Sequence, residues 1–196
     1  MSSFLSGGEQ WTNVYEEYES CSSVPAPIVE MFRPYVREEN MERLNRFLIS
    51  VRDHYNANAY HSFNHACHVS MSAECLVKNL DASVAANFDD VDKLALLFSA
   101  IIHDVDHLGV WNSKLVADGH PYALQFNDQS VAEMRSIQVG FDILARPECN
   151  FLESQLSPMD KTRFRKTVIE LVLCTDIGSK DRSRLTTLKI QDASTS

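Results

Sequence analysis

The chain has 196 residues, of which 44% are hydrophobic and 23% are charged, as in an ordinary globular protein with one core. The formal net charge of −9 argues against a general nucleic-acid binder, which would need a basic face. The five cysteines are scattered without Cys-x-x-Cys spacing, so we expect reduced thiols in a cytoplasmic protein. We see no leader pattern and no apolar run long enough to span a membrane.

Apolar residues recur at helical spacing along most of the chain, and no stretch alternates with the period of a strand. The predicted fold class is therefore all-α. A Ser/Gly-rich lead, residues 1–26, is expected to be flexible, with one short helix at about residues 11–18. Further helices are predicted at about residues 41–51, 69–80, 91–102, 131–144 and 157–175, then an amphipathic piece at 185–190 and a polar tail at 191–196.

Local signals add detail to three of these helices. Met71, Cys75 and Leu76 are predicted to form the apolar face of the helix at 69–80. The helix at 131–144 would be capped by Asn127 or Asp128. The helix at 157–175 would begin with a Ser cap followed by Pro and an acidic residue.

The chain is organised around residues 101–112, where an apolar helix leads directly into His103 and Asp104. At a helix end these two side chains can converge on one cation, and their nitrogen and oxygen donors suit Zn²⁺, Mn²⁺ or Fe²⁺. Asp106 and His107 follow within one turn. Four ionisable groups behind a core helix would be costly to bury without a metal ion or mutual pairing.

A second histidine cluster lies upstream. His61 and His65 are four residues apart, so in a helix they would share a face, and His68 could extend it. Each of these histidines alone could be an ordinary core or surface residue. Six of the seven histidines, however, lie between residues 54 and 107 in two clusters, so we predict a shared metal site.

Together the two clusters resemble the catalytic domain of the class I 3′,5′-cyclic nucleotide phosphodiesterases. The family pattern His-Asp-x-x-His-x-Gly-x-x-Asn is complete in residues 103–112. The pattern Tyr-His-Asn-x-x-His-Ala-x-Asp-Val corresponds to residues 60–69, with Ser62 and His68 where the family has Asn and Asp. Residues 126–133, 139–141 and 168–176 are also similar, in the family's order, so the resemblance runs from about residue 60 to residue 189.

The resemblance implies the multi-helix phosphodiesterase fold with its HD-type metal site, of which residues 27–190 would form the N-terminal portion only. It implies hydrolysis of cyclic AMP, cyclic GMP or both to nucleoside 5′-monophosphates in cyclic nucleotide signalling. Two divalent metal ions would be needed, Zn²⁺ with Mg²⁺ or Mn²⁺. The partner would be this small-molecule substrate, not a nucleic acid.

The same resemblance implies roles for individual residues. His65, His103 and Asp104 would be metal ligands, and His61 the general acid that protonates the O3′ leaving group. His107 and Glu133 would hold the water that attacks phosphorus. The residues that would surround these groups or line the substrate pocket are Tyr60, Asn112, Thr175 and Asp176.

Some features depart from the family. Met134, Arg135 and Ser136 stand where the family usually has Asn-His-His, so the surroundings of the site are altered. The family's fourth metal ligand and its purine pocket lie further downstream than residue 196, so we expect the chain alone to hydrolyse cyclic nucleotides poorly. We also expect the helices at 91–102 and 164–173 to leave apolar faces uncovered, which favours a homo-oligomer or other association.

Two other interpretations remain. The chain could be a truncated, catalytically weak or inactive regulatory paralogue that binds a partner protein. Less favoured is another HD-type metal phosphohydrolase, which would share His103 and Asp104 but would not need the segment from residue 60 to residue 69.

Overall fold

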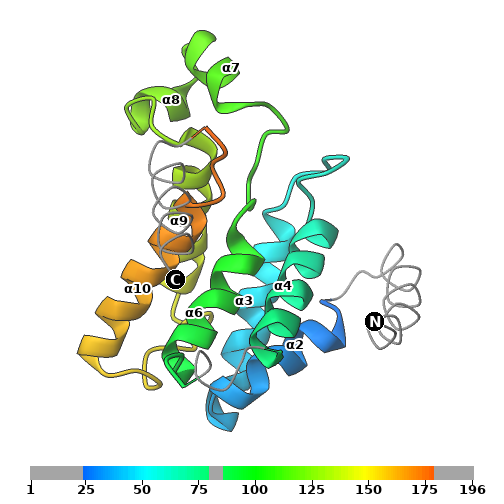
Figure 1. Cartoon of the computed structure of the whole chain (residues 1–196), viewed down its shortest axis with the longest axis vertical. Coiled ribbons are helices and arrows are strands. Elements are labelled where there is room, and N and C mark those ends of the chain that lie inside the picture. Colours follow the sequence, from blue (N-terminus) through cyan, green and yellow to red (C-terminus); the bar gives the residue numbers. More distant parts are fainter. Residues whose placement is uncertain (1–23, 80–85, 179–196) are drawn as a thin grey trace, which may run out of the picture.

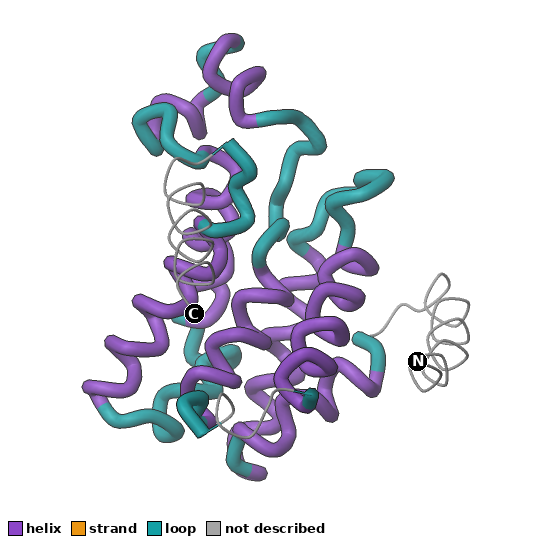
Figure 2. The backbone as a smooth tube through the Cα atoms, in the orientation of Figure 1, coloured by secondary structure: helices purple, strands orange, loops and turns teal. Residues whose placement is uncertain are grey.

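The computed structural model describes residues 24–79 and 86–178, and every regular element within them is a helix (Figure 1, Figure 2). The all-α prediction is confirmed for these residues. The predicted features at residues 1–23, 185–190 and 191–196 lie outside them. The elements are α2 (Ala26–Phe32), the 3₁₀ helices η1 (Arg33–Tyr35) and η2 (Glu38–Asn40), α3 (Met41–Asp53), α4 (Phe63–Lys78), α6 (Asp90–Ile102), α7 (Asn112–Ala117), α8 (Pro121–Gln125), α9 (Val131–Leu144) and α10 (Pro158–Leu173).

Helix α6 lies at the centre of the helical body, with α4 on one side and α10 on the other (Figure 1). It begins with a capping box between Asp89 and Asp92, as its acidic first turn suggests. Eight of its 13 residues are buried. Phe98 stacks on Phe47 of α3 at 5.0 Å and meets Phe164 of α10 edge-on at 5.2 Å. The core is therefore built around α6, whose end carries the HD pair.

The prediction that the helix at residues 91–102 leaves an apolar face uncovered is wrong. Helix α10 turns its buried side chains Phe164, Val168 and Val172 toward the core, and α10 and α6 pack along each other. Arg163 adds ion pairs from α10 to Asp89 and Asp92 at the start of α6. The two helices thus cover one another. The homo-oligomer stays a prediction, but an uncovered apolar face on α6 no longer supports it.

Helix α4 begins at Phe63, so residues 69–78 continue a helix that starts in the histidine cluster, and its N-cap is Ser62, whose hydroxyl accepts a hydrogen bond from the N–H of His65. Serine and asparagine are both good N-caps, so Ser62 can start this helix as well as the family's Asn. The predicted apolar face is only partly correct: Met71 packs on the core, but Leu76 is 70% exposed. Contacts with α6 and α2, and not the apolar pattern, decide which side of α4 is buried.

Helix α9 is not capped as predicted. Asn127 and Asp128 both have positive φ in the preceding turn, and the N-cap position is Ser130, with φ of 38° and no side-chain cap of its own. Further along, Gly140 lies against Ile102: a Cβ at this position would come within 2.6 Å of the Ile102 Cδ1 atom. Only glycine permits this approach without repacking, and it brings α9 close to the end of α6.

The loop before α4 and the loop after α6 lie at the same end of the helical body, as Figure 1 shows. The first of these loops carries His61, with His65 in the first turn of α4, and the second follows His103 and carries His107. In the part of the chain that the structure describes, no helix combines the length and the apolar composition required to cross a membrane.

Candidate metal and acid–base site

The end of α6 presents His103 and Asp104 together, and both are buried. The Nδ1 atom of His103 lies 2.9 Å from the carbonyl oxygen of Ala100. Because a carbonyl can only accept, Nδ1 carries the hydrogen, and Nε2 of the neutral ring has a free lone pair. This Nε2 lies 3.1 Å from Oδ2 of Asp104. A histidine oriented in this way by a backbone carbonyl is typical of a metal ligand.

Helix α4 adds His65 to this pair. Its Nε2 atom lies 3.7 Å from Oδ2 of Asp104, and one potential ligand atom from each of His65, His103 and Asp104 lies within 4.8 Å of the others. Two imidazoles and a carboxylate are a donor set that suits a divalent cation such as Zn²⁺. The structure thus brings together the three residues predicted as ligands, and their donor atoms fit the predicted kind of ion.

Charge and burial act differently on these three groups. Burial alone would lower the pKa of His103, but its hydrogen bond with Asp104 and the charge of that carboxylate outweigh burial, so the pKa is raised. The pKa of Asp104 is correspondingly lowered, against the effect of its burial. Burial, with the nearby charge of His103, lowers the pKa of His65. His65 is therefore ready to bind a cation as a neutral ring, whereas His103 first has to release a proton.

We expect the affinity for Co²⁺ to keep rising with pH above about 6.5, the ordinary pKa of histidine. The cation and the proton compete for Nε2 of His103, whose raised pKa means that the proton is displaced completely only at higher pH. Asp104 does not add to this dependence, because its lowered pKa keeps it ionised throughout. Calorimetric titration in two buffers of different ionisation enthalpy would count the released protons. An affinity that is flat above the ordinary histidine pKa would contradict the expectation.

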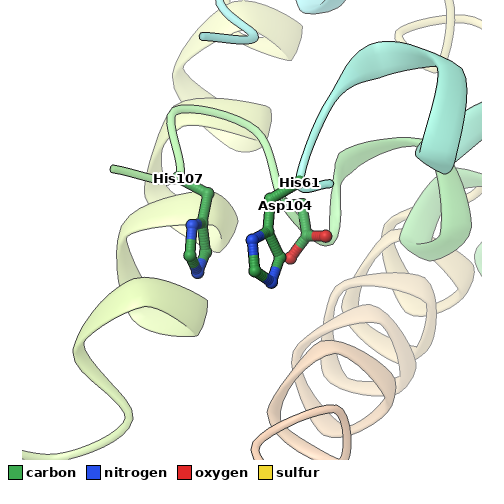
Figure 3. Close-up of side chains that lie close together, drawn as sticks. All are labelled: His61, Asp104 and His107. Atoms are coloured by element: carbon green, nitrogen blue, oxygen red, sulfur yellow. The ribbon is translucent and has the colours of Figure 1, made fainter. Parts of the chain in front are cut away.

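His61 and His107 form a second group beside the same carboxylate. Their rings are stacked with centroids 3.8 Å apart and planes 16° apart, and Figure 3 shows them face to face next to Asp104. His61, His107 and Asp104 also have potential ligand atoms within 4.8 Å of one another. The prediction that His61 shares a helix face with His65 is wrong, because His61 precedes the N-cap of α4 and is placed by the loop.

The hydrogen bonding of His107 is the reverse of that of His103. The backbone N–H of Gly109, at a φ of 74°, donates to Nδ1 of His107 at 2.9 Å. A nitrogen that accepts this bond carries no hydrogen, so the neutral ring has its hydrogen on Nε2. Burial and the charge of His61 lower the pKa of His107, which favours this neutral form. His107 is therefore suited to donate a hydrogen bond, and His103 to bind a cation.

Tyr60 lies where the sequence placed it, beside the histidines. Its ring is 4.4 Å from the ring of His65 and meets the ring of His61 edge-on at 5.0 Å. The tyrosine is 64% exposed, so it borders the two clusters on the solvent side.

Glu133 and Asn112 are bonded to each other. The Asn112 side chain donates to Oε2 of Glu133 at 2.8 Å, and its Oδ1 accepts from the backbone N–H of Ala132 at 2.8 Å. Asn112 therefore supplies the cap that α9 lacks at Ser130. Burial raises the pKa of Glu133, and the charges of Asp176 and Asp104 raise it further. The carboxyl of Glu133 is thus close enough to both acids to sense their charge.

Thr175 and Asp176 follow the end of α10. The Thr175 hydroxyl donates to the carbonyl oxygen of Val172 in its own helix, at 2.7 Å. Oδ2 of Asp176 accepts from the Ser130 hydroxyl at 2.7 Å, and Oδ1 accepts from the N–H of Gly178. Among the described residues neither belongs to the two groups around Asp104. Asp176 is tied to the start of α9, so its predicted link to the metal site is indirect in this structure.

Comparison with known proteins decides the family. A family model described as 3′5′-cyclic nucleotide phosphodiesterase matches residues 60–194. The chain belongs to this family. It is 37% identical over 152 residues to the probable 3′,5′-cyclic-AMP phosphodiesterase pde-4 of Caenorhabditis elegans, and 40% identical over 149 residues to the 3′,5′-cyclic-AMP phosphodiesterase 4C of Rattus norvegicus. The predicted resemblance is thereby confirmed.

Solved structures agree with this assignment. The phosphodiesterase domain of the RhoPDE fusion protein from the choanoflagellate Salpingoeca rosetta aligns with a TM-score of 0.72 at 28% identity, over 82% of this chain and 49% of that chain. Another structure of the Salpingoeca rosetta rhodopsin phosphodiesterase domain gives a TM-score of 0.72 at 30% identity and covers 83% of this chain and 48% of that chain. The predicted fold of a phosphodiesterase catalytic domain, present in part, is confirmed.

The chain spans much less than the full length of its relatives. Its matches cover 78% and 76% of the chain but 22% and 27% of the worm and rat proteins. Membership of the phosphodiesterase family implies divalent metal ions, and the group His65, His103 and Asp104 is a candidate place for one.

Two residues that contact the backbone or side chains of this candidate site were not predicted from the sequence. The Tyr55 hydroxyl donates to the carbonyl oxygen of Ile101 at 3.0 Å and accepts from the N–H of Asp104 at 3.4 Å, which holds the backbone at the end of α6. Arg135 was noted only as a departure from the family, yet it forms an ion pair with Asp106 at 2.7 Å. No spacing signal links these residues, because their partners are 29 and 46 or more positions away in the chain.

Proposed function

We propose that this protein hydrolyses 3′,5′-cyclic nucleotides to nucleoside 5′-monophosphates with the help of divalent metal ions. The single observation that carries the proposal is that two pairs of histidines meet at one carboxylate, Asp104, and that His103 of one pair and His107 of the other have opposite hydrogen bonding. One pair is suited to bind a cation and the other to handle protons. The worm and rat relatives are both named as cyclic-AMP phosphodiesterases, so cyclic AMP is the first candidate substrate and cyclic GMP the second.

We assign the metal ligands from donor chemistry. His65, His103 and Asp104 would hold a divalent cation, and Asp104 would also help to hold a second ion, while His61 would not be a ligand of either ion. The proposed pair is Zn²⁺ with Mg²⁺ or Mn²⁺, because nitrogen donors suit zinc and oxygen donors suit the other two. When bound, such ions neutralise charge on the phosphoryl oxygens and lower the pKa of a water molecule.

The chain's own residues would move the protons. Hydrolysis joins the oxygen of a water molecule to phosphorus and breaks the bond from phosphorus to O3′, so the water loses a proton and O3′ gains one. His61, which stacks on His107 and contacts the exposed Tyr60, would donate that proton. His107 would donate a hydrogen bond through Nε2, and Glu133, oriented by Asn112, would accept one from the attacking water.

The decisive experiment is a product assay. We would prepare the chain by itself and fused to the residues that follow the matched region in the rat relative, and incubate each with cyclic AMP and with cyclic GMP. We expect the fused protein to form the 5′-monophosphate, to lose activity on chelation and to regain it with Zn²⁺ plus Mg²⁺ or with Mn²⁺. A folded fusion without metal-dependent hydrolysis, or one that releases the 3′-monophosphate, would refute the proposal.

A further inference from the structure

We infer that Arg135 is a positioning residue for the proposed metal site, acting through the carboxylate of Asp106. The inference rests on the proposed function, because it concerns the turn that carries Asp104 and His107. Asp106 lies between these two residues, yet among the described residues it belongs to neither group of potential metal ligands. Its carboxylate is instead directed at the start of α9.

The ion pair between Arg135 and Asp106 converges on one oxygen. Both Nε and Nη2 of Arg135 lie within hydrogen-bond distance of Oδ2 of Asp106, at 2.8 and 2.7 Å. The guanidinium also lies over the ring of Tyr122, 4.6 Å from its centroid, and the Tyr122 hydroxyl donates to the same oxygen at 3.2 Å. The side chains of Arg135 and Asp106 are only 24% and 21% exposed. A partly buried charge pair with this many donors is far more rigid than a pair on an open surface.

Asp106 makes hydrogen bonds with several segments that carry residues of the proposed site. It has a φ of 62°, a conformation that aspartate tolerates better than most residues, and its backbone N–H donates to the carbonyl oxygen of His54. Asn56, in the loop that leads to His61, donates to Oδ1 of Asp106 at 3.4 Å and to the carbonyl oxygen of His107 at 3.0 Å. Arg135 lies on α9, two residues after Glu133. The ion pair therefore links the segments that carry His61, His107 and Glu133.

The charge of Arg135 has a second consequence for the site. Asp106 is only two residues from Asp104, so without a counter-charge its carboxylate would repel Asp104 or turn toward a bound cation as a competing ligand. With Arg135 present, Oδ2 of Asp106 is fully engaged by donors on α8 and α9. The arginine thereby preserves the positive φ at Asp106, and that turn sets the direction of His107.

The test measures Co²⁺ binding by the chain, using the visible absorption of the bound ion as a report on its ligands. We expect Arg135→Met to weaken Co²⁺ binding by about 10-fold or more, the usual effect of removing a group that orients metal ligands, and to change the spectrum. Asp106→Asn keeps a residue that tolerates positive φ but loses the charge, so it should cause a similar loss. Arg135→Lys retains the charge and should restore part of the affinity.

Two comparisons separate positioning from general stability. Arg165 also lies over an aromatic ring, 4.3 Å from that of Phe141, but it is exposed on α10 and away from the turn. Arg165→Met should therefore leave Co²⁺ affinity and spectrum unchanged. In a double-mutant cycle, Arg135→Met with Asp106→Asn should be little worse than either variant alone, because both remove the same contact.

The inference fails if Arg135→Met binds Co²⁺ with wild-type affinity and spectrum, or if the effects of the two substitutions simply add. If Arg135→Met does not fold, Asp106→Asn and Arg135→Lys carry the same test. If the wild-type chain binds no Co²⁺ at all, the proposed metal site is refuted and this inference with it. Binding by the wild type with no response to these variants refutes the positioning role alone.

Discussion

Replacing His61 by alanine is expected to lower the turnover of cyclic AMP by the fused protein by roughly 10²–10⁴-fold, the usual contribution of a general acid. The metal content should barely change, because His61 is outside the group formed by His65, His103 and Asp104. In the variant the O3′ alkoxide would leave without a proton. The measurement is steady-state turnover together with elemental analysis of the same protein samples.

A second substrate distinguishes an acid from a residue that only shapes the pocket. A nitrophenyl phosphodiester has a leaving group that needs no proton, so His61→Ala should impair its hydrolysis much less than that of cyclic AMP. His120→Asn is the matched control: His120 caps α8, belongs to neither group, and asparagine is also a good cap. Equal losses on both substrates, or loss of the metal in His61→Ala, would show that the assigned role is wrong.

Replacing His103 by alanine is expected to weaken Zn²⁺ or Co²⁺ binding by more than the roughly 10- to 100-fold that a change around a ligand causes. His103 supplies a buried nitrogen whose lone pair is directed by the carbonyl oxygen of Ala100, and no alanine atom can replace it. Competition with a chromophoric chelator would give the affinity, and elemental analysis the content. The same content in the wild type and the variant would overturn the ligand assignment.

The second variant for this test is His65→Ala. His103→Ala also leaves the Asp104 carboxylate without its closest partner, so part of its effect could come from a less stable fold. His65→Ala keeps the His103–Asp104 pair at 3.1 Å and removes only the more distant imidazole, 3.7 Å from the carboxylate. We expect it to lose metal affinity with a smaller change in thermal unfolding. If His65→Ala binds the metal ion with unaltered affinity, His65 is not a ligand, and the site consists only of residues at the end of α6.

Much of the helical architecture could be predicted from residues that are close together in the chain. The spacing of Leu44, Phe47, Leu48 and Val51 predicts the buried side of α3 correctly, and all four are fully buried. Ser157 and the acidic residues before α6 mark helix starts through capping, which involves neighbours three positions apart. The family patterns also predicted that the two histidine clusters share a site, and the structure brings them to Asp104.

Other features were decided by contacts between residues that are far apart in the chain. The stacking of His61 on His107, the capping of α9 by Asn112 and the ion pair of Arg135 with Asp106 have no local signal. The burial of α6 on nearly all sides also depends on where α10 folds back. Periodicity determines which side of a helix is apolar, but helix packing determines what covers it.

The chemical roles of the histidines depend on the same distinction. The sequence alone determined that imidazoles and a carboxylate are available at metal-ligand spacing, because residue type and helix geometry are local properties. Only the tertiary structure decided that His61 and His107, 46 residues apart, stack beside Asp104 while His65 approaches the same carboxylate from α4. The reason is that the packing of α4 against α6 brings the two segments together, and no local property of either segment determines that packing.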